Sequence, residues 1–325
     1  MKKAPVLVLA GPTAVGKTTL SLRLAKHFGA EIISADSMQV YKGMDIGTAK
    51  ATAREQALVP HHMIDVADPA APYSVADYVR QAEPVLKDIL ARGRLPLITG
   101  GTGFYIQALL KGLDFSEPLR DSALRSHLQE RMETEGPLAL HRELAEKDPA
   151  AAAAIHPHNR KRIIRALEYY EETGLRISDL NRQQQEKASP YRVLYLVLNL
   201  PREILYRQIE ERVEQMLQAG LAEEVAALKA NGIPAESTAM QALGYKEVLE
   251  YLEGRCSREE AVARIKLGTR HYAKRQLTWF RREKDTIWID KSLYENEEAL
   301  FHATLQLCEA FMERDGSSPK KEDIQ

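Results

Sequence analysis

The feature that most constrains the fold is a glycine-rich segment near the amino terminus, Gly11–Thr18, with the sequence GPTAVGKT. It follows the apolar run Val6–Ala10 and opens a helical pattern over Lys17–His27. A Gly-x4-Gly-Lys-Thr segment between a strand and a helix is typical of a phosphate-binding loop, because backbone N–H groups and the helix amino terminus converge there on phosphate oxygens. A glycine-rich turn without function is the alternative, and the strand-to-helix context disfavours it.

A phosphate loop identifies the group that is bound but not the reaction. Lys17 supplies a positive charge, and the Thr18 hydroxyl can ligate magnesium. The default interpretation is a nucleotide-hydrolysing or kinase-type enzyme, which should hold magnesium with an aspartate at the end of an apolar strand. Asp36, at the end of the run EIISAD, is the best candidate for that aspartate. A turn residue or a helix cap is the alternative role for Asp36.

Short runs rich in Val, Ile and Leu recur along the chain and are bounded by Gly, Pro or Asp. Such runs are typical of buried parallel strands. Helical patterns separate them, and one of these, Ser74–Arg92, opens with a Ser-x-x-Asp capping box. The alternation predicts an α/β fold with a phosphate-loop-type parallel sheet flanked by helices. The predicted strands are Val6–Ala10, Glu31–Ala35, Leu95–Thr99, Val193–Leu200 and Thr286–Asp290.

The stretch 116–187 breaks this alternation, because it holds several helical segments and no strand-like run. We therefore predict a helical insertion domain at 116–187 within a core domain formed by 1–115 and 188–315. The second part of the core is expected to be mostly helical from Pro201 to about Lys284, apart from turns near Gly220 and Gly232. The polar tail 316–325 is expected to be disordered.

Composition narrows the class of protein. The chain has 325 residues, of which 44% are hydrophobic and 28% charged, as in soluble globular proteins. Its two cysteines lack partners at metal-ligand spacing, so neither a zinc site nor a disulfide framework is indicated. The apolar stretch Pro5–Ala10 is too short for a signal sequence or a membrane span. We therefore expect a cytoplasmic protein without membrane association.

The net charge of −1 excludes a uniformly basic nucleic-acid binder but allows local basic faces. The stretch 264–284 carries eight Lys or Arg residues and one acid, and Lys266, Arg270 and Lys274 recur every four residues within it. With interleaved aromatic residues, this pattern indicates a face directed at nucleic-acid phosphates. A solvated helix face is the alternative. The cluster Arg160, Lys161 and Arg162 leaves the same two alternatives open.

Six further segments occur in a fixed order and, with the phosphate loop, closely resemble the tRNA dimethylallyltransferase (isopentenyltransferase) family. The resemblance runs from Pro5 to about Lys284. The carboxyl-terminal zinc finger of the eukaryotic members is missing, so the bacterial branch is the closer match. The segments are Ser34–Tyr41 (SADSMQVY), Met44–Lys50 (MDIGTAK), His61–Asp65 (HHMID), Gly100–Tyr105 (GGTGFY), Gln241–Lys246 (QALGYK) and Thr269–Arg281 (TRHYAKRQLTWFR).

The resemblance implies transfer of a dimethylallyl group from dimethylallyl diphosphate to N6 of the tRNA adenosine 3′-adjacent to the anticodon. It implies that the loop holds a diphosphate with Mg²⁺ rather than a nucleotide, and whether ATP also binds stays open. Asp36 matches the general base, Thr102 a threonine of the catalytic pocket, and Arg212 an arginine that binds the leaving diphosphate. The diphosphate-binding residues are expected to be Gly11, Thr13, Ala14, Gly16, Lys17 and Thr18, with Thr18 also the magnesium ligand.

The expected partners are the anticodon stem-loop of tRNA and dimethylallyl diphosphate, and we expect a monomer. The helical insertion is expected to clamp the stem-loop, and the target adenine must leave its stack to reach Asp36. The residues expected to contact tRNA are Ser37, Met38, Gln39, Arg125, Arg160, Lys161, Arg162, Gln241, Arg270 and Lys274.

Two other functional classes each account for part of the sequence. A small-molecule kinase or NTPase would rest on the phosphate loop alone and would act without tRNA. A non-catalytic RNA-binding module would rest on the basic stretch and would leave Gly11–Thr18 and Asp36 unexplained. Terpene-type prenyltransferases hold magnesium with Asp-Asp-x-x-Asp clusters, and the chain contains no Asp-Asp dipeptide, which argues against that class.

Overall fold

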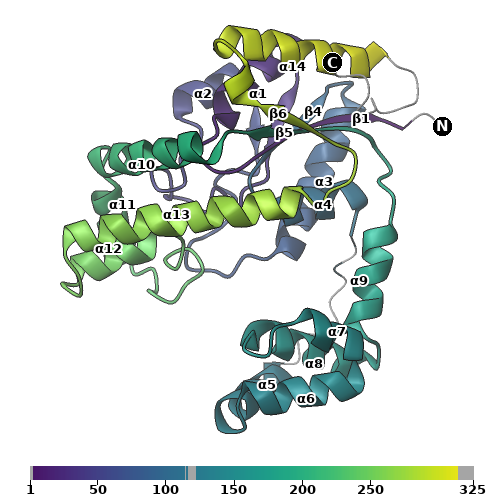
Figure 1. Ribbon diagram of the computed structural model, residues 1–325, viewed down its shortest axis with the longest axis vertical. Helices are drawn as coiled ribbons and strands as arrows, with labels where there is room; N and C mark the ends of the chain where they lie inside the picture. The colour runs from purple at the N-terminus through teal and green to yellow at the C-terminus, as the bar shows by residue number, and fades with distance from the viewer. Residues whose placement is uncertain (1–2, 114, 116–121, 314–325) are drawn as a thin grey trace. The chain divides into compact units, whose positions relative to one another are not determined.

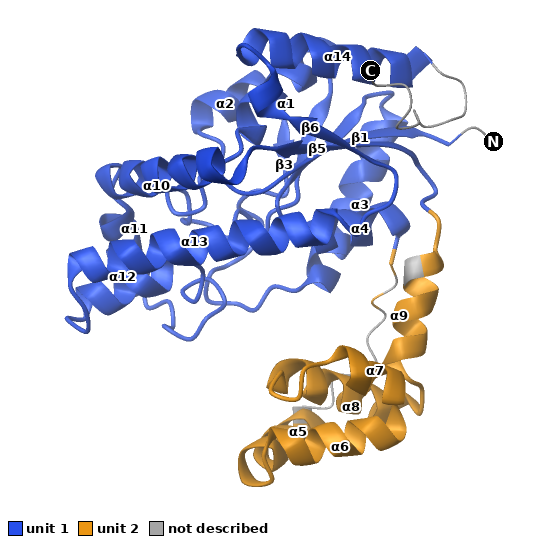
Figure 2. Cartoon of the chain, viewed as in Figure 1, with its two compact units in different colours: residues 1–112, 189–325 blue, residues 113–188 orange. Residues whose placement is uncertain are grey.

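The computed structural model describes residues 3–113, 115 and 122–313, and the chain divides into two compact units (Figure 2). Unit 1 comprises residues 1–112 and 189–325, and unit 2 comprises residues 113–188. The tail 316–325, predicted to be disordered, lies outside the described residues.

Unit 1 is built on one parallel sheet, which confirms the predicted fold class (Figure 1). The described strands lie in the order β3-β2-β4-β1-β5-β6, so β1, which leads into the phosphate loop, is central. Val8 of β1 lies between Ile98 of β4 and Tyr195 of β5. The strands are β1 (Pro5–Ala10), β2 (Glu31–Ser34), β3 (His61–His62), β4 (Pro96–Gly100), β5 (Arg192–Asn199) and β6 (Thr286–Asp290).

Helices cover both faces of this sheet. In Figure 1, α1 (Lys17–Phe28) and α14 (Glu297–Glu313) lie on one side, and α3 (Val75–Ala91), α4 (Gly103–Lys111) and α13 (Arg258–Phe280) lie on the other. No helix within the described ranges combines the length and the apolar character that crossing a bilayer requires. The remaining helices of unit 1 are α2 (Ala53–Leu58), α10 (Arg202–Gln218), α11 (Leu221–Ala230), α12 (Tyr245–Leu252) and the 3-10 helix η1 (Lys291–Leu293).

Local signals set several helix ends. The predicted capping box of α3 is confirmed, because Asp77 N donates to Ser74 Oγ over 3.3 Å and Ser74 N donates to Asp77 Oδ2 over 2.9 Å. Pro201 is the cap of α10, which begins at Arg202, one residue after the predicted start of the helical part. Between α11 and α12 the chain forms irregular turns from residue 231 to 244, a longer break than the single turn predicted near Gly232.

The edge strand β3 has no counterpart in the sequence pattern, because two residues cannot show a periodicity. Its position is fixed by Glu31 at the start of β2, which accepts hydrogen bonds from Arg92 and pairs with Nε2 of His62 at 2.8 Å. The Arg92 guanidinium, with help from His62, lowers the pKa of Glu31 to about 2. The adjacent histidines 61 and 62 therefore belong to the sheet edge.

Unit 2 is a helical body with its own core. Leu128, Leu140, Leu144 and Leu167 are buried there. Asp148 joins two of its helices, because its Oδ1 accepts from Ala151 N over 3.0 Å and its Oδ2 accepts from Ser178 N over 2.9 Å. The helices are α5 (Ser122–Thr134), α6 (Pro137–Lys147), α7 (Pro149–Ala154), α8 (Arg160–Thr173) and α9 (Ile177–Glu186).

Candidate active site

The phosphate loop joins β1 to α1 through a turn that few sequences can adopt. Ala14 and Gly16 have φ of 65° and 92°, in the left-handed region. A Cβ atom on Gly11 would lie 2.6 Å from the carbonyl oxygen of Leu198 on the neighbouring strand β5, so only glycine fits. The loop therefore turns directly over the carboxyl end of the sheet, where open α/β sheets bind ligands.

Lys17 folds back over this loop. Its Nζ donates to the carbonyl oxygens of Gly11 (3.0 Å) and Pro12 (2.8 Å). Burial, followed by the nearby Arg212 guanidinium, lowers the pKa of Lys17 to about 7, although Asp36 acts in the opposite direction. A second cation thus faces the lysine across the same pocket, an arrangement that an anion would stabilise.

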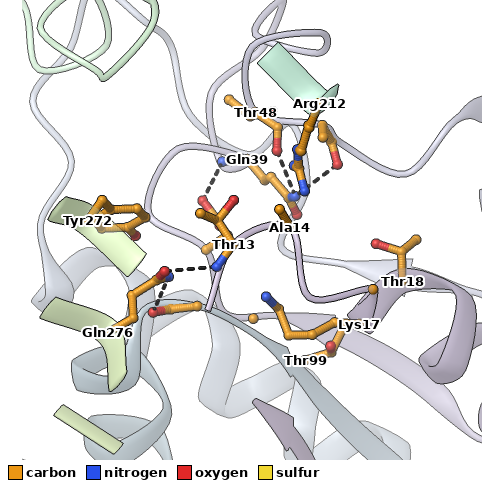
Figure 3. A pocket seen from close by; sticks show the side chains of 15 residues that line it. Thr13, Ala14, Lys17, Thr18, Gln39, Thr48, Thr99, Arg212, Tyr272 and Gln276 are labelled. Atoms are coloured by element: carbon orange, nitrogen blue, oxygen red, sulfur yellow. Dashed lines mark hydrogen bonds between the residues drawn. The ribbon is translucent and has the colours of Figure 1, made fainter. Parts of the chain in front are cut away.

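Gln276 of α13 connects the phosphate loop to the end of β4 (Figure 3). Its Oε1 accepts from Thr13 N, and its Nε2 donates to Gly101 O, each over 2.9 Å. A Cβ atom on Gly101 would lie 2.1 Å from that Nε2. Tyr272, one turn earlier on α13, also lines the pocket, and burial together with the Asp36 carboxylate raises its pKa.

Asp36 follows β2 in a tight turn and lines the same pocket. Its Oδ1 accepts from the backbone N–H groups of Met38 (2.9 Å) and Gln39 (3.3 Å). Its Oδ2 accepts no hydrogen bond from the part of the chain that the structure describes. Thr102 fixes the same turn, because its Oγ1 accepts from Ser37 N over 3.0 Å. One carboxylate oxygen is thus structural, and the other is available for chemistry.

Arg212 reaches the pocket from the middle of α10. Burial lowers its pKa, and Asp36 opposes this shift. Its Nε is buried, and no described residue accepts a hydrogen bond from it. A buried donor without an acceptor is costly, so this guanidinium is arranged for an acceptor that a bound anion would supply.

Gln39 is held by the protein itself. Its Oε1 accepts from Ser34 Oγ over 2.9 Å. Its Nε2 donates to the carbonyl oxygens of Thr48 (3.2 Å) and Ala49 (3.3 Å), as Figure 3 shows. Its predicted contact with tRNA is untested. In this structure its side chain joins the strand end of β2 to the 44–50 segment.

Glu224 of α11 anchors that segment. Its carboxylate accepts from the backbone N–H groups of three successive residues, Asp45 (2.9 Å), Ile46 (2.7 Å) and Gly47 (3.1 Å), and from the hydroxyl of Tyr245 (2.5 Å). Two motifs noted in the sequence, MDIGTAK and QALGYK, therefore meet at one glutamate. No local sequence pattern indicates Glu224, because its role depends on a contact between distant segments.

One pocket gathers most of the predicted catalytic and diphosphate-binding residues. Gly11, Ser37, Met38 and Thr102 adjoin residues of this pocket without lining it. Gln241 does not line it either, since its Nε2 donates to Ala235 O over 2.9 Å in the loop before α12. The lining residues are Thr13, Ala14, Gly16, Lys17, Thr18, Asp36, Gln39, Thr48, Ala49, Thr99, Gly100, Gly101, Arg212, Tyr272 and Gln276.

The donor set suits a magnesium ion only in combination with a bound phosphate. No cluster of three or more His, Cys, Asp or Glu that could hold a metal occurs among the described residues. Thr18 offers one hydroxyl on the pocket wall. Magnesium commonly keeps several waters and binds through few protein groups plus substrate phosphates, so this sparse set fits such an ion.

The basic face predicted for the stretch 264–284, which lies mostly on α13, contains cations with and without acidic partners. Lys266 Nζ lies 2.5 Å from Glu214 Oε1, and Arg270 forms an ion pair with Glu210. Both acids lie on α10, so these cations join two helices. Lys274 is exposed and has no ion pair within the described ranges. The four-residue periodicity was real, but it could not indicate that the facing helix carries acids.

The basic residues of unit 2 that were predicted to contact tRNA also include both ion-paired and exposed cations. Arg125 lies 3.4 Å from the carboxylate of buried Glu168, and Arg160 Nη1 lies 2.7 Å from Glu133 Oε1. Lys161 and Arg162, at the amino end of α8, are exposed. Cations at a helix amino terminus are unfavourable with the helix dipole, so a bound anion would stabilise this end.

Family models, named relatives and solved structures are similar to this chain over most of its length. A family model described as IPP transferase matches residues 39–283, and one described as isopentenyl transferase matches residues 4–61. The protein called tRNA dimethylallyltransferase in Lachnoclostridium phytofermentans is 51% identical over 91% of this chain and 95% of the relative. The solved structure of a tRNA isopentenylpyrophosphate transferase from Bacillus halodurans is 42% identical, covers 96% of this chain and 97% of its own, and has a TM-score of 0.72. A eukaryotic dimethylallyltransferase described as acting on tRNA is 29% identical, with a TM-score of 0.85 over 98% of this chain and 81% of its own.

Proposed function

Because the chain belongs to the tRNA dimethylallyltransferase family and is therefore a tRNA-prenylating transferase, we propose that its donor is dimethylallyl diphosphate. We further propose that its acceptor is N6 of the adenosine 3′-adjacent to the anticodon, tRNA position 37. The observation that carries this proposal is a single pocket lined by two cations, Lys17 and Arg212, and by the carboxylate of Asp36. The products are N6-(dimethylallyl)adenosine and diphosphate.

The proposed reaction is one displacement. The N6 lone pair forms a bond to the allylic C1, the bond between C1 and the bridging oxygen breaks, and its electron pair leaves with diphosphate. Negative charge grows on the leaving oxygen, where the loop N–H groups, Lys17 and Arg212 stabilise it. The N6 proton becomes acidic as the new bond forms, and Oδ2 of Asp36 accepts it.

The residues around Asp36 keep this carboxylate in place. The N–H groups of Met38 and Gln39 fix its Oδ1. Thr102 fixes the backbone of Ser37 next to it. We propose that Ser37, Met38 and Gln39 border the adenine and that Thr102 acts on the reaction through this turn.

Thr18, together with the donor diphosphate and water, would hold Mg²⁺ in this pocket. When bound, the ion would offset charge on the diphosphate. Thr13, Ala14 and Gly16 line the same pocket, and the N–H groups of Ala14 and Gly16 would bind the same phosphates, whereas the N–H of Thr13 donates to Gln276 Oε1.

On the tRNA side we propose contacts from Lys274 in unit 1 and from Arg125, Lys161 and Arg162 in unit 2, with Gln241 on a loop near α12. Arg125, Arg160 and Arg270 each have an acidic partner in this structure, so they would reach RNA only after exchanging that partner. We propose that the enzyme acts as a monomer in the cytoplasm.

One experiment tests the function directly. Labelled dimethylallyl diphosphate is incubated with the protein and bulk tRNA, and label is sought in the RNA. Label that enters the RNA, and enters it about 10²–10⁴ more slowly with Asp36→Asn, supports the proposal. Robust ATP hydrolysis without tRNA, with no label in RNA, would instead favour a nucleotide-hydrolysing enzyme.

A further inference from the structure

A row of alternating aromatic and arginine side chains leads away from the pocket along α13. Tyr272, Arg275, Trp279 and Arg282 are three or four residues apart, so they share one face of the helix and the turn that follows it. Tyr272 lines the pocket, and Cζ of Arg275 lies 5.7 Å from the centroid of its ring. Arg275 and Arg282 are exposed. We call these four side chains the α13 row.

A second aromatic ring lies against the outer part of the α13 row. The ring of Phe104, at the start of α4, is 5.9 Å from that of Trp279 at an interplanar angle of 58°, and 37% of Phe104 is exposed. Trp279 is seated on the backbone of Gly103, where a Cβ atom would lie 2.1 Å from indole Cδ1. Gly103 and Phe104 directly follow Thr102 in the chain. The aromatic pair thus borders the turn that holds Asp36 in place.

The positive charge of the α13 row is not neutralised. Among the residues that the structure describes, neither Arg275 nor Arg282 forms an ion pair, whereas Arg264 lies 2.6 Å from Glu250. Glu283, the single acid of the stretch 264–284, accepts a hydrogen bond from Gln107 of α4 over 3.3 Å, and burial raises its pKa. Within the described ranges, Glu283 forms no ion pair with either arginine of the row.

We propose that the RNA strand next to the target adenosine runs along the α13 row, with one neighbouring base stacked on the Phe104–Trp279 pair. Arg275 and Arg282 would contact its phosphates. Unstacked bases of single-stranded RNA bind proteins by stacking on aromatic rings, and cations follow the backbone. An extruded adenosine leaves neighbours that need such a surface. This inference rests on the proposed function and adds the path of the RNA.

Salt dependence tests the phosphate contacts. Affinity for an anticodon stem-loop RNA is measured without donor at several salt concentrations for the parent protein, Arg275→Gln and Arg282→Gln. Each substitution should weaken binding and reduce the slope of log affinity against log salt by about 0.7. Arg264→Gln is the control, since it removes the same charge from the same helix, and it should leave the slope unchanged. Slopes equal to the parent's in both test variants would overturn the phosphate contacts.

Fluorescence tests the stacked base. The RNA carries 2-aminopurine in place of a base adjacent to the target adenosine, and binding is followed for the parent protein, Phe104→Tyr and Phe104→Leu. Stacking quenches 2-aminopurine, so the parent and the tyrosine variant should quench it and the leucine variant should not, although leucine keeps an apolar side chain. Equal quenching by the leucine variant would overturn the stacking. Because no donor is present, this outcome is independent of whether the parent transfers label to tRNA.

Discussion

Lys17 and Arg212 face one pocket from two separate elements, and the guanidinium of Arg212 adds to burial in lowering the pKa of Lys17 to about 7. The phosphate loop supplies the first cation, and a helix almost two hundred residues later in the chain supplies the second. Two cations that disfavour each other in the free protein bind a doubly charged group more strongly than either would alone, because the bound anion removes their repulsion.

Donor affinity should therefore depend on pH. As pH rises from 7 to 9, Lys17 loses its proton in the free protein, so the Kd for dimethylallyl diphosphate should rise, by at most about tenfold per pH unit. Isothermal calorimetry checks this. Lys17→Arg, whose side chain stays charged, should show only the pH dependence of the ligand itself. Identical pH profiles for the parent and this variant would contradict the lowered pKa.

The same pKa has a consequence for stability. The pKa of Lys17 in the folded protein lies below its usual value of 10.5, so the unfolded chain holds more protons between pH 7 and 10.5. The contribution of Lys17 to stability therefore rises with pH over that window. Lys17→Met should therefore raise the Tm of the ligand-free protein at pH 7 while abolishing donor binding. A lower Tm would count against the assignment.

Asp36→Asn should separate chemistry from binding. Asparagine keeps an oxygen that accepts from Met38 N and Gln39 N, so the turn survives, but the amide cannot take the N6 proton. Single-turnover transfer should fall by about 10²–10⁴, with Kd values for donor and tRNA within roughly tenfold of the parent. Rapid-quench assays give both quantities. Transfer within a few-fold of the parent would remove Asp36 from the mechanism.

Gln276→Leu should loosen the phosphate loop. Leucine leaves Thr13 N–H and Gly101 O without their partner, at a cost of about 1–3 kcal/mol for each buried group. Urea denaturation should show the lost stability, and donor Kd should rise. Gln218→Leu, at an exposed position on α10, is the matched control. Donor affinity that is equal in both variants would show that the bridge does not shape the loop.

Glu224→Gln should disturb the 44–50 segment from a distance. The neutral amide is a weaker acceptor for the three backbone N–H groups, and we expect the free energy of unfolding to fall by about 1–3 kcal/mol. Thr48 and Ala49, which follow this anchor, line the pocket, so donor or tRNA affinity should weaken as well. Glu223→Gln, an exposed neighbour on α11, should change neither quantity.

The ion pair between Arg270 and Glu210 should prove structural. A double-mutant cycle with Arg270→Gln and Glu210→Gln should give a coupling of about 0.2–1 kcal/mol in unfolding free energy, since both side chains are partly exposed. The salt slope of tRNA binding should stay unchanged in Arg270→Gln but fall in Lys274→Gln. A lower slope for Arg270→Gln would instead indicate that Arg270 contacts tRNA phosphates.

The sequence predicted those parts of the protein that local patterns determine. Apolar runs indicated five strands to within about one residue, and β6 (Thr286–Asp290) has the predicted bounds. The phosphate loop was predictable because all of its groups lie in one short segment. Nothing periodic indicated β3 or α2, because both elements are short. β3 is held by pairing with β2, whereas α2 opens with a local capping box between Thr52 and Glu55.

The other walls of the pocket depend on contacts between distant segments. Arg212 was found through a family resemblance, and Gln276 and Glu224 were not singled out, because each acts through hydrogen bonds to a loop far away in sequence. Charge periodicity on α13 showed where cations recur but not which ones face acids on α10. Two of the three predicted cations, Lys266 and Arg270, do so.

The position of β1 between β4 and β5 has a consequence for synthesis on the ribosome. The first part of unit 1 emerges with β1, β2 and β4, but the whole of unit 2 must be made before β5 arrives. Until then one edge of the central strand is unpaired, and such edges promote association with other chains. The pocket closes later still, when Gln276 reaches the phosphate loop, so the nascent enzyme is inactive until nearly all of its chain has been translated.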